Sequence, residues 1–161
     1  MYHDMMYSLR MRIALEPPQQ PEVLALMAEL DAFHTVVYPS ESIPGTDIDA
    51  LGQPNVLFAV ARDAQGQAVG CGAVVLESTF GQLRRMFVAP SQRGQGIAKE
   101  LLVFLEAQAV ARGCGVLRLE TGSRQADALA LYARSGYVRR DPFGGLTNGL
   151  FSVFMEKRLG D

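Results

Sequence analysis

The sequence predicts an α/β fold, a mixed sheet covered by helices on both faces, and three observations support this prediction. Short stretches with strand composition stand before and after long segments with helical periodicity. One helical segment follows a strand directly, through a turn rich in glycine. Helices between strands act as crossovers, so part of the sheet is parallel and both faces are covered. Residues 1–161 are expected to form a single domain, because no repeat or linker divides them.

The first half of the chain is expected to supply a strand, a helix and a hairpin. Residues 1–7 are expected to be a loose leader. Apolar and basic residues alternate over 9–15, which predicts a half-buried strand. A helix is expected over 21–33, because apolar residues recur on one of its faces after a proline suited to the first turn. Two apolar runs, 55–62 and 68–76, flank a turn and predict an antiparallel hairpin.

The segment between that helix and the hairpin has the composition of an ordered loop. Residues 34–50 contain Pro39, Pro44 and Gly45 among clustered polar groups. Asp47 is expected to cap a short helix near the end of the segment. Loops of this kind often carry function on a rigid scaffold, although a plain connection between helix and sheet is an equally open interpretation.

The second half is built around a strand, a glycine turn and a long helix. A short apolar strand is expected at 83–89, followed by the turn 91–96. From Ile97 onward, apolar residues recur every fourth position, which predicts an amphipathic helix that ends before Gly113. The remaining elements are expected as strands at 116–120, 137–138 and 151–157 and a helix at 125–135.

Composition and charge exclude several classes of function. A formal net charge of -2 gives no reason to expect a nucleic acid or an anionic membrane as partner. No apolar run approaches the roughly 20 residues that a membrane helix requires. Cys71 and Cys114 are read as free thiols in a reducing cytoplasm. His3 and His34 are too few and too far apart for metal-ligand spacing, so no metal is expected.

The turn before the long helix has the features of an anion site. The first turn of a helix carries unpaired N–H groups and partial positive charge. Gly94 and Gly96 let an anion approach these groups, and Arg93 adds a cation. Glycines that serve only to turn the chain are the alternative interpretation. A P-loop is excluded because no Lys-Ser/Thr pair follows, and a dinucleotide fingerprint because Lys99 replaces its third glycine.

Two motifs resemble those of a known superfamily. The run Arg93-Gly94-Gln95-Gly96-Ile97-Ala98 resembles the R/Q-x-x-G-x-G/A element of the GNAT acetyl-CoA-dependent N-acetyltransferases. Residues 128–137, ALALYARSGY, resemble the second signature of that superfamily, A-x-x-L-Y-x-x-x-G-F/Y. The resemblance covers the chain from about Leu9 onward. It implies a seven-stranded, mostly antiparallel GNAT sheet and transfer of an acetyl group from acetyl-CoA, and relatives often form homodimers.

The resemblance also implies which residues bind acetyl-CoA. The pantetheine arm is expected along the central strand and the pyrophosphate on the amides of the glycine turn and first helical turn. The residues concerned are Met86, Phe87, Val88, Arg93, Gly94, Gln95, Gly96, Ile97, Ala98 and Lys99. Tyr132 matches the usual general acid, which protonates the departing sulfur. A core aromatic at helical spacing is the alternative for Tyr132, and the motif match outweighs it.

The general base and the acceptor are less determined. Many relatives carry a glutamate early on the central strand, where this chain has Gln82, Arg84 and Arg85. Glu120, at the end of the next strand, is the first candidate base and Glu41 the second, with a water relay equally open. The candidate acceptor-binding residues are Tyr38, Glu41, Ser42, Arg84, Thr121 and Ser123.

These candidates favour a small, amino-acid-like amine as the acceptor, because they combine acidic and basic groups. Arg84 is expected to hold an acceptor carboxylate or to be a solvated surface charge. Thr121 and Ser123 either contact the acceptor or cap the next helix. The alternatives are acetylation of a peptide or protein amine and a non-catalytic CoA-binding module. Tyr132 favours an enzyme, since a binding module has no need of a hydroxyl there.

Overall fold

The computed structural model describes residues 5–7, 11–37, 48–143 and 151–160. Within these residues an eight-stranded sheet has the order β1-β2-β3-β4-β5-β6-β8-β7. Every neighbouring pair is antiparallel except β5 and β6, which are parallel. The strands are β1 (Met5–Tyr7), β2 (Met11–Leu15), β3 (Val56–Asp63), β4 (Ala68–Leu76), β5 (Gly81–Val88), β6 (Val116–Gly122), β7 (Val138–Arg140) and β8 (Ser152–Arg158). The helices are α1 (Pro21–Val37), α2 (Ile48–Leu51), α3 (Ile97–Ala111) and α4 (Ala126–Arg134).

The mixed, mostly antiparallel sheet confirms the predicted fold class. The seven predicted strands correspond to β2–β8, and β1 is added at the edge. The expected loose leader is therefore wrong for Met5–Tyr7, because their backbone pairs antiparallel with β2. The expected loop after the first helix also begins later than predicted. Helix α1 continues through His34 to Val37, since polar and β-branched residues in its last turn do not stop a helix packed on a sheet.

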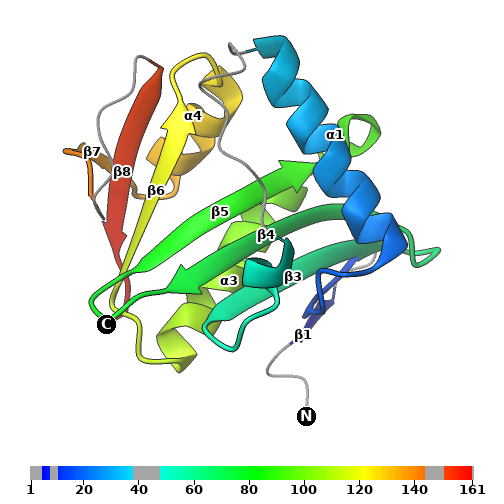
Figure 1. Cartoon of the computed structure of the whole chain (residues 1–161), viewed down its shortest axis with the longest axis horizontal. Coiled ribbons are helices and arrows are strands. Elements are labelled where there is room, and N and C mark those ends of the chain that lie inside the picture. The colour runs from blue at the N-terminus through cyan, green and yellow to red at the C-terminus, as the bar shows by residue number, and fades with distance from the viewer. Residues whose placement is uncertain (1–4, 8–10, 38–47, 144–150, 161) are drawn as a thin grey trace.

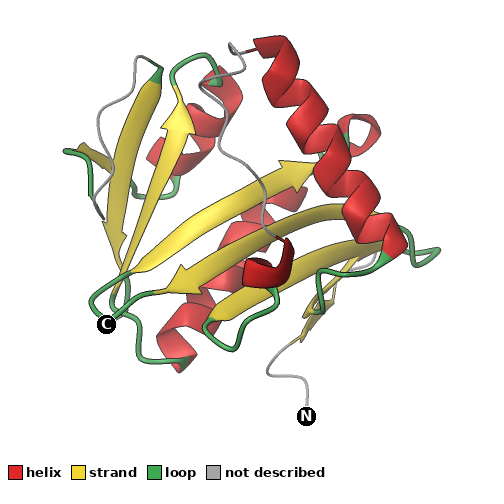
Figure 2. Ribbon diagram, viewed as in Figure 1, coloured by secondary structure: helices red, strands yellow, loops and turns green. Residues whose placement is uncertain are grey.

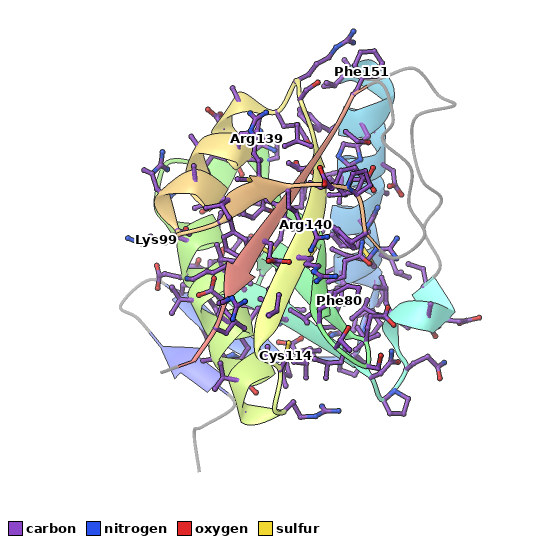
Figure 3. The ribbon with its side chains drawn as sticks, turned by 90° about the vertical axis from the view of Figure 1, so that its left-hand side faces the viewer. Phe80, Lys99, Cys114, Arg139, Arg140 and Phe151 are labelled. Atoms are coloured by element: carbon purple, nitrogen blue, oxygen red, sulfur yellow. The ribbon has the colours of Figure 1, made fainter. Side chains whose placement is uncertain are left out.

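Helices cover the sheet on both faces, as predicted. Figure 3 shows α1 on one side of the strands, with α3 and α4 on the other. The core under α1 contains Val23, Leu26, Met27, Leu30, Phe58, Val60, Cys71 and Phe87. The core under α3 and α4 includes Leu83, Val88, Leu101, Leu105, Leu117, Leu119 and Tyr132. The sheet is thus the middle of three layers, and burial of these apolar side chains holds the layers together.

Strand β5 contains a bulge at its centre. Ala73 of β4 pairs with Arg84, but Cys71 pairs with Phe87, so β5 has one more residue than β4 between these two pairs. Arg85 lies in this interval with a φ of 59°, the one non-glycine positive φ in the described chain. A bulge bends and twists its strand, and it directs successive side chains away from strict alternation.

Strands β5 and β6 are paired only at one end. Gly81–Leu83 pairs with Leu117–Leu119, and the two strands then separate. Figure 1 shows them diverging from a common corner, and Figure 2 shows no strand between their far ends. Beyond Leu83, the edge of β5 that would face β6 therefore has no strand partner. A mixed sheet that opens in this way offers backbone donors and acceptors to an extended ligand.

Candidate active site

The glycine turn leads into a helix start that is open to an anion. Gly94 and Gly96 have φ values of 82° and 80°, which side chains other than glycine rarely adopt. No atom lies within 4 Å of the position that a Cβ would take at either glycine. The N–H of Glu100 donates to the carbonyl of Gly96 at 3.1 Å, so the amides of 97–99 precede the first helical hydrogen bond. These donors, at the positive end of α3, fit the pyrophosphate of a CoA molecule.

Arg93 turns its side chain back toward the end of β5. Its Nε donates to the carbonyl of Val88 at 3.1 Å. Its guanidinium lies over the rings of Phe33 and Phe87, with 5.8 Å and 5.5 Å between the guanidinium carbon and the ring centres. The charge of Arg93 is therefore held beside the glycine turn on the α1 side of the sheet. Lys99, in the first turn of α3, is exposed and projects away from the sheet (Figure 3).

The three predicted pantetheine residues lie on the part of β5 that has separated from β6. Met86 and Val88 face the core under α3, whereas Phe87 faces α1. Gly72 of β4 makes room for Met86, because a Cβ at Gly72 would come within 2.3 Å of the Met86 sulfur. The bulge and this glycine together direct the side chains of β5 away from the opening between β5 and β6. The backbone of β5 therefore remains available for hydrogen bonds at this opening.

Tyr132 comes from α4, on the α3 side of the sheet. Its ring is buried and packs edge to face with Tyr137, with 5.7 Å between the centres. Burial raises the pKa of the Tyr132 hydroxyl to about 12, so the phenol keeps its proton at neutral pH. In the described part of the chain this hydroxyl has no hydrogen-bond partner, whereas the hydroxyl of Tyr137 donates to Glu106 at 2.8 Å. The two neighbouring tyrosines thus have different environments. The hydroxyl of Tyr137 is engaged in a hydrogen bond to Glu106, whereas the protonated hydroxyl of Tyr132 has no partner among the described residues.

Glu120 lies on the opposite face from Tyr132. Leu119 points into the core under α3 and α4, and Glu120 follows it on the strand, so its exposed side chain is on the α1 side. Its carboxylate accepts a hydrogen bond from the hydroxyl of Ser152 at 2.5 Å. The structure therefore places the two predicted catalytic side chains on different sides of the opening between β5 and β6.

The loop after β6 contacts the end of α1. Thr121 donates from its hydroxyl to Oε1 of Gln125 at 3.0 Å, and Nε2 of Gln125 lies 3.3 Å from Nε2 of His34. Thr121 does not cap α4, which begins after Gln125 without a side-chain cap. Ser123 is exposed, and its backbone N–H donates to the carbonyl of Phe151 at 2.7 Å. Figure 3 shows Phe151 next to the start of β8.

The two arginines of β5 differ in their surroundings. Arg84 is exposed and makes no hydrogen bond or ion pair within the described residues. Arg85 is held under α1 by Asp31, with 2.9 Å between Nη2 and Oδ1. The sequence indicated Arg84 as an acceptor-binding residue, and not Arg85, Asp31 or His34. No sequence signal marks the bulge that brings Arg85 to α1, and His34 was assigned to a loop.

Three predicted acceptor-binding residues, Tyr38, Glu41 and Ser42, lie outside the described residues. Within the described ranges, no group of three or more His, Cys, Asp or Glu side chains is placed to hold a metal ion. The same ranges contain no helix of the length and apolarity needed to cross a membrane.

Comparisons with known proteins show what this chain is similar to. An IAA acetyltransferase from Azospirillum brasilense is 43% identical over 149 residues, which cover 91% of this chain and 97% of that protein. A solved structure of a candidate acyl-CoA N-acyltransferase from Klebsiella pneumoniae subsp. pneumoniae MGH 78578 is 40% identical, with a TM-score of 0.79 over 92% of this chain and 97% of that one. A GNAT family acetyltransferase from Elizabethkingia anophelis with acetyl-CoA bound has the same fold, with a TM-score of 0.67 at 16% identity over 94% of this chain and 100% of that one.

The profile of the Acetyltransferase (GNAT) family matches residues 23–137. This span begins in α1 and includes the bulged strand, the glycine turn, α3 and Tyr132. Enzymes of this family use acetyl-CoA as the acetyl donor. The chain therefore belongs to the GNAT family of acetyltransferases.

Proposed function

We propose that this N-acetyltransferase acts on the amine of a small, amino-acid-like acceptor. The observation that carries the proposal is the composition of the two sides of the opening between β5 and β6. A protonated phenol, Tyr132, lies on one side. A carboxylate, Glu120, and two arginines, Arg84 and Arg85, lie on the other. A molecule with both an ammonium and a carboxylate group matches that second side in charge.

Acetyl-CoA supplies the acetyl group as a thioester. In our proposal the amides of 97–99 and the glycine turn bind its pyrophosphate, and the free edge of β5 at 86–88 pairs with its pantetheine arm. The open space over Gly94 and Gly96 supports this assignment. The side chain of Arg93 adds positive charge beside the turn, although its Nε is engaged by Val88. Lys99 contributes through its backbone N–H, since its side chain projects outward (Figure 3).

The acceptor amine must lose a proton before it attacks. A free alkyl ammonium has a pKa of about 10.4, so producing the neutral amine at pH 7 costs roughly 4–5 kcal/mol. We propose that Glu120 accepts this proton, directly or through a water molecule, because its carboxylate is at the end of β6 on the acceptor side. Its hydrogen bond from Ser152 orients the carboxylate and leaves the other oxygen for the substrate.

The departing thiolate must gain a proton, and we propose that Tyr132 donates it. The raised pKa of Tyr132 keeps the phenol protonated, and the absence of a hydrogen-bond partner among the described residues leaves Oη available to the sulfur. Base and acid on opposite sides of the sheet suit a transfer in which the amine enters from one side and the thiol leaves on the other. A binding module without turnover would not need this arrangement.

The test is a thiol-release assay with acetyl-CoA and a panel of amino acids, polyamines, aminoglycosides, short peptides and IAA. Mass spectrometry of the product would identify the acetylated atom. We expect turnover on one or more amino-acid-like amines and at least about 10-fold lower kcat/KM on acceptors that carry no carboxylate. Efficient turnover on polyamines, aminoglycosides or peptides alone would contradict the proposal.

A further inference from the structure

Two arginines of the sheet are buried to the same degree but differ in how their hydrogen bonds are satisfied. The side chain of Arg62 is 10% exposed. Its Nε and Nη2 donate to the carboxylate of Glu16, and Nη2 also donates to Gln20. Its Nη1 donates to the carbonyl of Gly66 and to Glu22. All five N–H groups of this guanidinium thus have acceptors, which is the normal state of a buried arginine.

Arg85 has fewer hydrogen-bond partners than Arg62 among the described residues. Its side chain is 8% exposed. Its Nη2 donates to the carbonyl of Met27 at 3.3 Å and to Asp31 at 2.9 Å. Nε is enclosed and has no partner, and Nη1 makes no hydrogen bond to any residue in the described ranges. Leaving a buried charged donor unpaired costs more than leaving a neutral one unpaired, so the enclosed Nε–H of Arg85 requires a reason.

The backbone is bent to put this guanidinium where it is. Arg85 has a φ of 59°, in the left-handed region that residues other than glycine rarely adopt. The bulge sends the Arg85 side chain under α1, while Met86 goes to the opposite face over Gly72. The position is next to Met86–Val88, the free edge proposed for the pantetheine arm. Backbone strain and an unsatisfied charge at one residue are features that accumulate at ligand-binding positions.

In the described part of the chain, few negative groups surround Arg85. Among the residues that the structure describes, Asp31 is the one carboxylate that contacts it, and the Asp31 side chain is 42% exposed. His34, on the same helix, is close enough for the charge of Arg85 to lower its pKa further, after burial. The carbonyl of Arg85 itself accepts a weak hydrogen bond from the Cys71 thiol. Arg84 precedes it on β5, exposed and without an ion pair in the described chain.

We propose that Arg85 binds the carboxylate of the acceptor and so selects acceptors that carry one. A carboxylate has two oxygens and a full negative charge, and it would supply acceptors to the unpaired N–H groups of Arg85. The bound amine would then lie beside the free edge of β5, at a distance from the arginine set by the length of the acceptor. This inference rests on the proposed function and deepens it, because it assigns the selecting residue to Arg85 and not to the exposed Arg84.

The experiment compares binding of carboxylates and their amides to the CoA-loaded protein and its variants. The probes are L-amino acids and the corresponding L-amino acid amides, with calorimetry and thermal shift as readouts that need no turnover. Arg85→Asn removes the guanidinium and tolerates a positive φ, so the backbone is not further strained. Asp31→Asn breaks the Arg85–Asp31 ion pair and leaves the guanidinium in place. Arg62→Met is the control for a buried arginine whose hydrogen bonds are saturated.

We expect the wild type to bind at least one amino acid about 10- to 100-fold more tightly than its amide. Arg85→Asn should abolish this preference with unchanged affinity for CoA, and kcat/KM should fall by the same factor on acceptors that are turned over. Asp31→Asn should keep or increase the preference, because it removes a competing carboxylate. If Arg85 only ties α1 to β5, both substitutions break the same pair and should act alike.

Three results would overturn the inference: no carboxylate preference in the wild type, the same preference in Arg85→Asn, or an equal loss in Arg85→Asn and Asp31→Asn. Failure of the proposed function is a separate outcome. It would show as absent acetyl transfer to every amine, while the binding comparison still decides the role of Arg85. Loss of the preference in Arg62→Met would also count against a specific role for Arg85.

Discussion

The amide nitrogen of Gln125 lies 3.3 Å from Nε2 of His34, and this contact joins the loop after β6 to the last turn of α1. The backbone N–H of Gly122 donates to Oε1 of Gln125 at 3.1 Å, which fixes the orientation of the amide. An amide N–H can only donate, so Nε2 of His34 must accept. His34 is therefore neutral, with its proton on Nδ1.

We predict that His34 makes the protein less stable in mild acid. Burial first, and the charge of Arg85 second, lower the pKa of His34 in the folded state, while Asp31 acts in the opposite direction. The unfolded chain then binds a proton more readily, so stability is full above about pH 6.5 and declines as the pH falls below it. Urea unfolding between pH 5 and 8 should show a smaller decline for His34→Gln than for the wild type. If the free energy of unfolding changes with pH in the same way in both proteins, His34 has no part in the pH dependence.

We predict that Tyr132→Phe lowers kcat about 100-fold or more and leaves the KM for acetyl-CoA unchanged, because it removes a proton donor that acts only in the transition state. The free energy of unfolding should be almost unchanged, since the Tyr132 hydroxyl has no hydrogen-bond partner in the described chain. Thiol release and thermal unfolding measure the two effects.

The matched control for Tyr132 is its ring neighbour. Tyr137→Phe removes the hydroxyl that donates to Glu106 at 2.8 Å. It should destabilise the fold by about 1–2 kcal/mol and leave kcat near the wild-type value. If both phenylalanine variants lose activity to the same extent, the effect would reside in the aromatic pair and not in proton donation by Tyr132.

We predict that Gly96→Ala raises the KM for acetyl-CoA about 10-fold, because the new methyl group would occupy the space over the first-turn amides of α3. Gly113→Ala at the other end of α3 is the control. Gly96 and Gly113 have φ values of 80° and 83°, and a Cβ at either position would meet no atom within 4 Å. Both substitutions should cost roughly 1–2 kcal/mol of backbone strain. An equal change in KM for both variants would contradict a phosphate site at Gly96.

We predict that Arg62→Met destabilises the protein by about 3 kcal/mol, because it leaves the buried carboxylate of Glu16 without its charge partner. The Glu16 side chain is 15% exposed; burial raises its pKa, and hydrogen bonds from Arg62 and Gln20 outweigh this and lower it. Wild-type stability should therefore fall below about pH 4.5 as Glu16 gains a proton. The double variant Arg62→Met/Glu16→Leu should regain most of the free energy of unfolding that Arg62→Met loses, as measured by urea unfolding. If it regains none, the loss does not come from the unpaired carboxylate of Glu16.

Much of the fold was predictable because its elements carry local signals. Apolar and polar residues alternate over β2 and β6, and apolar residues recur at every fourth position of α3. These patterns predict the three elements within a few residues of their observed bounds. The left-handed glycines at 94, 96, 113 and 136 also stand where the sequence placed turns and helix ends. The two GNAT motifs identified the family because they are continuous in sequence. Strand β1 was missed, since three residues that pair through their backbone leave no pattern in the side chains.

The candidate acceptor site was predicted less well, for a physical reason. Glu120 and Tyr132 were selected from the sequence, but their placement on opposite faces follows from the alternation of side chains on β6 and from the packing of α4 on the α3 side of the sheet. Arg84 was selected, whereas the adjacent Arg85 proved to be the arginine under α1. One extra residue in β5 decides which of two neighbouring arginines is buried.

By itself, the sequence determined the class of fold, the family and the glycine turn before α3, since each depends on residues close together in the chain. Only the tertiary structure decided which polar and charged groups meet. The pairs Arg85–Asp31 and Gln125–His34 join residues 54 and 91 positions apart. Their contact depends on a bulge, on the splay of two strands and on the length of α1. These three features depend on packing and backbone pairing over the whole sheet, so no local sequence pattern predicts them.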